Sequence, residues 1–194
     1  MKSIAALLTL AATGAAIAGI VGTAHDLSGD FNGPDGNQVC IYCHTPHNAT
    51  AHVPLWNRDT SVANYTMYDS FTEDYDHPST VDGSSVLCMS CHDGTIALNA
   101  IHNGNVGGNP TFISGDGLLD TDLTNDHPIS FVYQSSIDNG DTGLFPASNN
   151  AVAALLEGGK VQCASCHDVH GSSFDPFLRM SNAGSALCLT CHNK

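Results

Sequence analysis

Apolar residues gather near the N-terminus of this chain and occur only in short groups after it. Lys2 precedes an apolar run over 4–16, which only Thr and Gly interrupt and which Ala16-Ile17-Ala18 follows. A basic residue, an apolar stretch of this length and a small-x-small triplet are the parts of a secretory signal peptide. We therefore expect residues 1–18 to be a cleaved signal and residues 19–194 to form a single secreted domain, extracellular or at the cell surface.

Beyond the expected signal, the pattern predicts a few short helices. Ser84 and Ser185 each precede a short apolar group, and serine in that position is typical of a helix N-cap. A third helix is expected over 150–157, capped by one of the two asparagines at 149–150 and ended by the Gly-Gly pair that follows. No segment after the signal is long and apolar enough to cross a bilayer, so we expect no membrane span.

Two short strands are expected as well, at 131–133 and around 144–145, on either side of the turn-forming triplet Asp138-Asn139-Gly140. Gly, Asn, Asp, Ser and Thr are frequent through the remaining chain, which favours turns and irregular backbone. The pattern therefore predicts an irregular, loop-rich fold with few short helices and minimal strand.

The charge of the chain is strongly acidic, with a formal net charge of −14 at pH 7. Without Lys2, four basic residues face 19 acidic ones, and the net charge becomes −15 (4 − 19). Such a surface repels nucleic acid and anionic lipid, and it attracts cationic partners or divalent metal ions. A plain solubilising surface explains the same charge equally well.

Every cysteine of the chain belongs to one of four Cys-x-x-Cys-His pentapeptides. This spacing is the attachment signature of c-type haem, in which two thiols form thioether bonds to one porphyrin and the adjoining histidine becomes the proximal iron ligand. The motifs predict four covalently bound haem c groups, and four macrocycles in so short a chain would themselves form most of the core. The attachment residues are Cys40, Cys43, Cys88, Cys91, Cys163, Cys166, Cys188 and Cys191, and the proximal histidines are His44, His92, His167 and His192.

Paired cysteines also occur in zinc ribbons, in redox-active dithiols and in structural disulfides. Zinc ribbons use two Cys-x-x-Cys pairs around one metal ion but do not require a histidine after each pair. Redox-active dithiols need neither four copies nor the histidine. Structural disulfides more often join distant cysteines. The histidine after all four pairs favours haem.

Seven further histidines are available as distal ligands for four irons: His25, His47, His52, His77, His102, His127 and His170. This surplus predicts that every iron is bound by two histidines. Met67 and Met180 are alternative axial ligands that would raise the reduction potential, but the supply of histidine makes them unnecessary.

The positions of these histidines separate strong candidates from reserves. His47 and His170 each follow a proximal histidine by three residues, too close to reach the opposite face of the same haem, so each would bind a different haem and hold two macrocycles together. His127 precedes a proline, which holds it in extended backbone, and Asp126 could orient it. His77 lies in an identical Asp-His-Pro triplet and is a reserve, as are His52 and His102.

Several longer phrases resemble one known family, the extracellular tetrahaem cytochromes of metal-reducing microbes that polymerise into conductive filaments. The resemblance covers nearly all of the expected mature chain and is more specific than the haem motif alone. The phrases are residues 22–28, 43–47, 54–58, 91–95, 125–131, 166–171, 176–179 and 188–193.

The resemblance implies a loop-rich fold, bis-histidine haems in a continuous stack and electron transfer outside the cell. It implies a homopolymer in which one iron per subunit is completed by a histidine from the adjacent subunit, with His25 as one candidate for that donor. Redox proteins or extracellular acceptors such as metal oxides would be its electron partners. The matching distal positions are His25, His47, His127 and His170, whereas His77 lies in an apparent insertion.

The leading hypothesis for function is an electron conduit and not an enzyme, because an iron with two histidine ligands has no open position for a substrate. A multihaem reductase of nitrite, sulfite or hydroxylamine would need at least one five-coordinate iron, often marked by an atypical motif, and no motif here departs from Cys-x-x-Cys-His. A soluble monomeric periplasmic shuttle is chemically the same as the conduit. Only the family phrases favour the filament over the shuttle.

Overall fold

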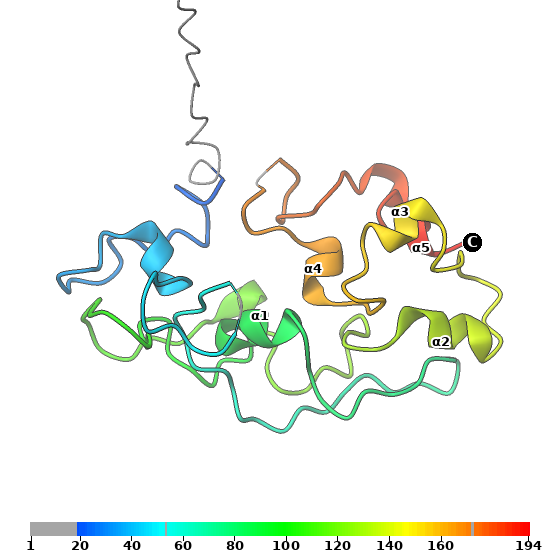
Figure 1. Ribbon diagram of the computed structural model, residues 1–194, viewed down its shortest axis with the longest axis horizontal. Coiled ribbons are helices and arrows are strands. Elements are labelled where there is room, and N and C mark those ends of the chain that lie inside the picture. The colour runs from blue at the N-terminus through cyan, green and yellow to red at the C-terminus, as the bar shows by residue number, and fades with distance from the viewer. Residues whose placement is uncertain (1–18, 53, 172) are drawn as a thin grey trace, which may run out of the picture.

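A computed structural model describes residues 19–52, 54–171 and 173–194 (Figure 1). The predicted signal peptide at 1–18 lies outside the described residues. The prediction that 19–194 form one domain after cleavage of that signal therefore stays a prediction.

Loops dominate the described chain, and its regular elements are short. In chain order they are η1 (Val39–Tyr42), α1 (Ser85–His92), η2 (Gly115–Gly117), α2 (Tyr133–Asp138), α3 (Asn150–Ala153), α4 (Cys163–Cys166), η3 (Ala183–Ser185) and α5 (Cys188–Cys191). Pairing between extended segments in the described residues is limited to isolated bridges. The expected loop-rich fold with few short helices and minimal strand is confirmed.

Three of the four haem-attachment motifs contain an α-helix, and the first contains a 3₁₀-helix. The helix α1 begins after Ser84, as predicted, although the Ser84 side chain makes no capping hydrogen bond. The helix α5 begins after Leu187, and Ser185 is not its N-cap: Ser185 has a φ of 63°, in the left-handed region, and not the extended backbone typical of an N-cap. The predicted short helix in the fourth motif therefore forms, but the prediction that Ser185 is its N-cap is wrong.

The helix predicted over 150–157 forms, but it is shorter. Asn149 is its N-cap, and its side chain accepts a hydrogen bond from the Ala151 N–H at 2.9 Å. The helix α3 ends at Ala153 because the following segment pairs with itself: Glu157 and Lys160 exchange backbone hydrogen bonds of 3.0 Å. The two glycines between them have φ values of 58° and 84°, a conformation that favours glycine and makes a tight reversal.

The two predicted strands do not form. Val132 makes only an isolated bridge with Lys160, and Leu144 makes one with His192. Tyr133 instead begins α2, and its hydroxyl donates to the Phe145 carbonyl at 2.7 Å. The apolar residues of these two segments pack into a local cluster, and no strand ladder is involved.

Three small apolar clusters replace a single core, and each contains or contacts residues of a motif. The first contains Tyr75, Phe131, Tyr133, Val152 and Val161 and packs against Cys191. The second contains Phe31, Tyr42 and Val106 and packs against Cys43, while the third contains Val81, Met89 and Leu123. Figure 1 shows the chain spread along one axis, with the N-terminal segments at one end and α2, α3 and α5 at the other. A core made of stacked haems stays a prediction.

Within the described ranges, every helix is too short to carry an apolar stretch that crosses a membrane.

Candidate haem-binding sites

The first Cys-x-x-Cys-His motif folds back against the segment that follows it. His44 pairs with Trp56 in an isolated antiparallel bridge, and the Cys43 carbonyl accepts a hydrogen bond from the Asn57 N–H at 2.9 Å. Nδ1 of His44 lies 2.7 Å from the carbonyl oxygen of Pro54. The imidazole is therefore held at one nitrogen by the backbone of its own following loop.

The third motif repeats this arrangement. His167 pairs with Leu178, and the Arg179 N–H donates to the Cys166 carbonyl at 2.9 Å. Nδ1 of His167 lies 3.0 Å from the carbonyl oxygen of Pro176. The two motifs therefore share one local design, a Pro-x-x segment that bridges back to the proximal histidine.

Such contacts fix the tautomer of four histidines: His44, His92, His127 and His167. Nδ1 of His92 lies 2.6 Å from the Gly117 carbonyl, and Nδ1 of His127 lies 2.9 Å from the Pro128 carbonyl. A carbonyl oxygen can only accept, so Nδ1 carries the proton in each ring that makes such a contact. Nε2 is then the unprotonated nitrogen, as in metal-ligating histidines whose other nitrogen donates to a carbonyl.

Three of the four proximal histidines lie opposite a predicted distal histidine from elsewhere in the chain. The partner of each comes from a segment distant in sequence, and all three separations between ring centroids are nearly equal. They are 6.1 Å for His25 and His92, 6.2 Å for His44 and His170, and 6.3 Å for His127 and His192.

These separations fit a metal ion held between two imidazoles. Each metal–nitrogen bond is about 2 Å long, so two imidazoles on opposite sides of one ion place their centroids about 6 Å apart. The thiols of each motif are adjacent in sequence to its histidine, as attachment of haem c requires. The residues present therefore fit haem c with two axial histidines at the first, second and fourth motifs.

Burial favours the neutral form of two of these rings by lowering their pKa. It lowers the pKa of His25, and the charges of nearby His92 and His167 lower it further. Burial also lowers the pKa of His192, with added contributions from His127 and Lys194. The neutral imidazole is the form that binds a metal ion.

His47 and His167 are the two remaining predicted ligands. Within the described chain, neither ring lies against another histidine ring. His47 is exposed, and its carbonyl accepts hydrogen bonds from Thr45 Oγ1 at 2.9 Å and Asn103 Nδ2 at 3.2 Å. The loop that carries His47 is thus fixed through its backbone while its side chain is accessible.

The three reserve histidines lie away from the motif histidines. Nε2 of His77 is 2.7 Å from Glu73 Oε1, and Nδ1 of His102 is 3.3 Å from Asp59 Oδ1. His52 is exposed. In the described part of the chain, none of the three forms a ring contact with a motif histidine.

The thiols do not match a zinc ribbon or a redox-active dithiol. All eight are free, and the one group of three or more close potential metal ligands in the described residues contains no cysteine, unlike a zinc ribbon. Burial raises the pKa of Cys43 to about 12 and also raises that of Cys91, whereas redox-active dithiols have a lowered pKa. At Cys163 the direction is opposite, because hydrogen bonding from the neighbouring Cys88 thiol lowers its pKa.

A buried polar network holds the second motif against the third. Ser85 Oγ, at the start of α1, donates to Gln162 Oε1 at 2.5 Å and accepts from the Cys163 N–H at 2.9 Å. Gln162 in turn forms a capping box with Ser165 at the start of α4. All three polar side chains are buried, so the network sets the position of α1 against α4.

Sequence reasoning identified the cysteines and histidines of the sites but missed the groups that orient the imidazoles. The carbonyls of Pro54, Gly117 and Pro176 are backbone atoms, which no residue type marks. A weak signal existed: a Pro-x-x segment follows two proximal histidines at nearly equal spacing, 10 and 9 residues.

The motifs, the paired histidines and the loop-rich fold define a protein that carries covalently attached haem. Residues 154–194, which contain the third and fourth motifs, match the family described as the doubled CXXCH motif. No curated protein matches the chain. The doubled motif indicates a multihaem c-type cytochrome, an electron carrier with covalently bound haem c.

Proposed function

We propose that this protein carries electrons outside the cytoplasm through four haem c groups, each held by two histidines, as the repeating subunit of a filament. The observation that carries the proposal is the near-identical separation of three histidine pairs, 6.1–6.3 Å between ring centroids. Haem c, when bound, supplies one-electron exchange between ferric and ferrous iron.

The residues of the chain divide this task between attachment, ligation and orientation. The eight motif cysteines attach the groups, and the motif histidines act as proximal ligands. His25, His127 and His170 are the distal ligands of the second, fourth and first motifs. Carbonyl groups that accept from Nδ1 keep the ligating Nε2 unprotonated, and two nitrogen ligands favour a low potential compared with His/Met cytochromes.

The pairing within one chain supports donation of His47 to a neighbouring subunit. His170, three residues after the third motif, lies opposite His44 of the first motif. His47 stands in the same relation to the first motif, and His167 of the third motif is the proximal ligand that lacks a partner histidine ring in the described chain. Repeating the His170–His44 relation between subunits would pair His47 with His167 of the next chain.

Such an interface is head-to-tail, since it joins the first motif of one subunit to the third motif of another. A head-to-tail interface that does not close into a ring generates an open helical filament. His25, the donor that the family resemblance suggested, already lies opposite His92 in its own chain, so His47 is better supported. Electron partners would be redox proteins or extracellular acceptors such as metal oxides.

The proposal is tested on the secreted protein by mass and by spectroscopy. We expect the mass to exceed that of the polypeptide after residue 18 by four haem groups, and the reduced spectrum to show low-spin bands that carbon monoxide leaves unchanged in the assembled filament. A polypeptide mass without haem would contradict the attachment. A high-spin fraction that binds carbon monoxide in the assembled filament would favour a reductase with an open iron.

A further inference from the structure

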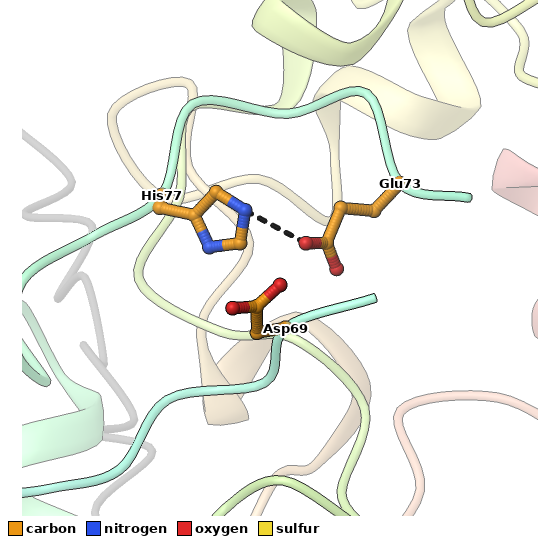
Figure 2. Close-up of side chains that lie close together, drawn as sticks. All are labelled: Asp69, Glu73 and His77. Atoms are coloured by element: carbon orange, nitrogen blue, oxygen red, sulfur yellow. Dashed lines mark ion pairs between the residues drawn. The ribbon is translucent and has the colours of Figure 1, made fainter. Parts of the chain in front are cut away.

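The loop 69–77 brings together three potential metal ligands that lie outside the Cys-x-x-Cys-His motifs. Ligand atoms of Asp69, Glu73 and His77 all lie within 4.8 Å of one another. Figure 2 shows the imidazole of His77 and the carboxylates of Glu73 and Asp69 directed toward a common space. Each of the three residues is separated from the next by four positions in the sequence. This is the one such cluster in the part of the chain that the structure describes.

Glu73 is the observation that points to a bound cation. Its side chain is only 8% exposed, and neither carboxylate oxygen accepts a hydrogen bond of good geometry among the described residues, although the hydroxyl of Tyr75 lies close by. Nε2 of His77 lies 2.7 Å from Oε1, yet the contact lacks hydrogen-bond geometry. No Lys or Arg forms an ion pair with Glu73 in the described ranges. A buried carboxylate whose neighbours are an imidazole and a phenol, without a basic side chain, is only partly compensated, and a metal ion between these groups would complete the compensation.

The loop is held in place by contacts that leave its ligand atoms free. Tyr75 packs on Phe131 with ring centroids 4.4 Å apart, in the same apolar cluster that contacts Cys191. The Asp76 N–H donates to Ser135 Oγ at 3.0 Å, which ties the loop to α2. Tyr75 also lies beside the His77 ring, at 5.0 Å between centroids, and limits its orientation. The three ligands are therefore presented by an anchored segment.

The ligand set selects the class of ion. One imidazole nitrogen and two carboxylate groups match first-row divalent ions such as Zn²⁺, which binds His, Asp and Glu at about 2.0–2.2 Å. Ca²⁺ takes six or more oxygen ligands and does not favour imidazole. Three protein ligands leave at least one position for water, so the site is open.

We propose that Asp69, Glu73 and His77 bind one divalent transition-metal ion of the Zn²⁺ class, at a site separate from the four haem groups. The acidic surface would draw such cations toward it. His77 then has a role of its own and is not a reserve haem ligand.

The test uses the secreted holoprotein after treatment with a chelator, with Zn²⁺ alone as the probe. Equilibrium dialysis with elemental analysis should give one tightly bound Zn²⁺ per chain, which an excess of Ca²⁺ does not displace. Glu73→Gln and His77→Gln should each weaken binding by at least about tenfold. Asp74→Asn is the matched control, since it removes one negative charge from the same loop outside the ligand set, and it should bind as the wild type does.

Three results would overturn the proposal. One is unchanged Zn²⁺ binding in both Glu73→Gln and His77→Gln, and another is an equal loss in Asp74→Asn, which would indicate binding to the acidic surface in general. The third is a low-spin haem signal that His77→Gln converts to high spin, since His77 would then be an iron ligand. Asp69→Asn changes an exposed ligand, so it provides the same test if Glu73→Gln is poorly secreted.

Discussion

Arg58 is almost completely buried, with 1% of its surface exposed, and it forms no ion pair in the described residues. Its guanidinium instead donates to three carbonyls: Nη1 to Leu98 at 2.7 Å, and Nη2 to Ala97 at 2.7 Å and to Ser90 at 3.3 Å. Ser90 lies within the second motif, whereas Arg58 follows the first. A single charged side chain therefore joins the surroundings of two haem sites.

We expect Arg58→Met to lower the free energy of unfolding by at least about 3 kcal/mol, because it leaves several buried carbonyls without a donor. Urea unfolding followed by circular dichroism of the holoprotein measures the change. Arg179→Met is the control. Arg179 is exposed, and in the described residues its side chain makes one hydrogen bond, to the Ala164 carbonyl at 3.3 Å, so its loss should cost less than about 1 kcal/mol. Equal effects of the two changes would contradict the role given to Arg58.

The short helices of this protein are placed by polar side chains from loops more than by helix packing. The turn before α1 provides an example: Asp82 forms an ion pair with Lys160, from the Gly-Gly reversal after α3, and accepts from Gln162 Nε2 at 2.8 Å. The Asp82 N–H donates to Ser130 Oγ at 3.0 Å. Three segments distant in sequence thus meet at one residue.

The pH dependence of stability should report this contact. Burial raises the pKa of Asp82, but hydrogen bonds from Lys160 and Gln162 outweigh it and leave the pKa below its ordinary value. A lowered folded-state pKa gives stability that is present above the unfolded value, about 4, and lost as the pH falls through the folded value. The denaturation midpoint of the wild type should therefore exceed that of Asp82→Asn at pH 6, and the gap should narrow below pH of about 4.

Lys160→Gln removes the cationic partner of Asp82. In a protein that carries Lys160→Gln, the added change Asp82→Asn should therefore lower the denaturation midpoint at pH 6 by less than it does in the wild type. The difference in denaturation midpoint between wild type and Asp82→Asn is then compared well below and well above the carboxyl pKa. If it is the same at both, the carboxylate does not stabilise the fold through its charge. Both measurements use the holoprotein, so haem attachment is the same in all variants.

The molecule as a whole is extended, with three small apolar clusters in place of one core. Its histidines pair across the described chain at three motifs and leave one predicted donor, His47, and one predicted acceptor, His167. In the proposed head-to-tail assembly, His47 of one chain would pair with His167 of the next, so every predicted ligand would have a partner.

His47→Ala should therefore abolish filaments while all four haem groups stay attached, because attachment depends on the cysteines. Electron microscopy of the secreted protein measures assembly, and mass spectrometry measures the haem count. His52→Ala, which changes an exposed histidine further along the same loop, should still form filaments. Filaments from His47→Ala, or a wild type that stays monodisperse at high concentration, would contradict this assembly.

Local patterns in the sequence predicted part of this architecture correctly. The loop-rich character followed from composition, and the N-caps Ser84 and Asn149 followed from residues that favour these positions. The prediction of strands at 131–133 and 144–145 was wrong, because Phe131, Tyr133, Leu144 and Phe145 pack into one apolar cluster and Tyr133 begins a helix. The predicted length of α3 was too great. The helix stops early because Glu157 pairs with Lys160 in the turn that follows, and a helix pattern does not include that contact.

The sequence by itself determined the chemistry: the spacing of cysteine and histidine within five residues specifies attachment of haem c, since that geometry is local to one short segment. It also determined that distal ligands were in surplus. Only the tertiary structure decided which histidine lies opposite which, because His25 and His92, or His44 and His170, meet through folding of long loops. The same is true of the carbonyls that set the tautomers and of the burial of the Glu73 side chain, because both depend on how the loops fold.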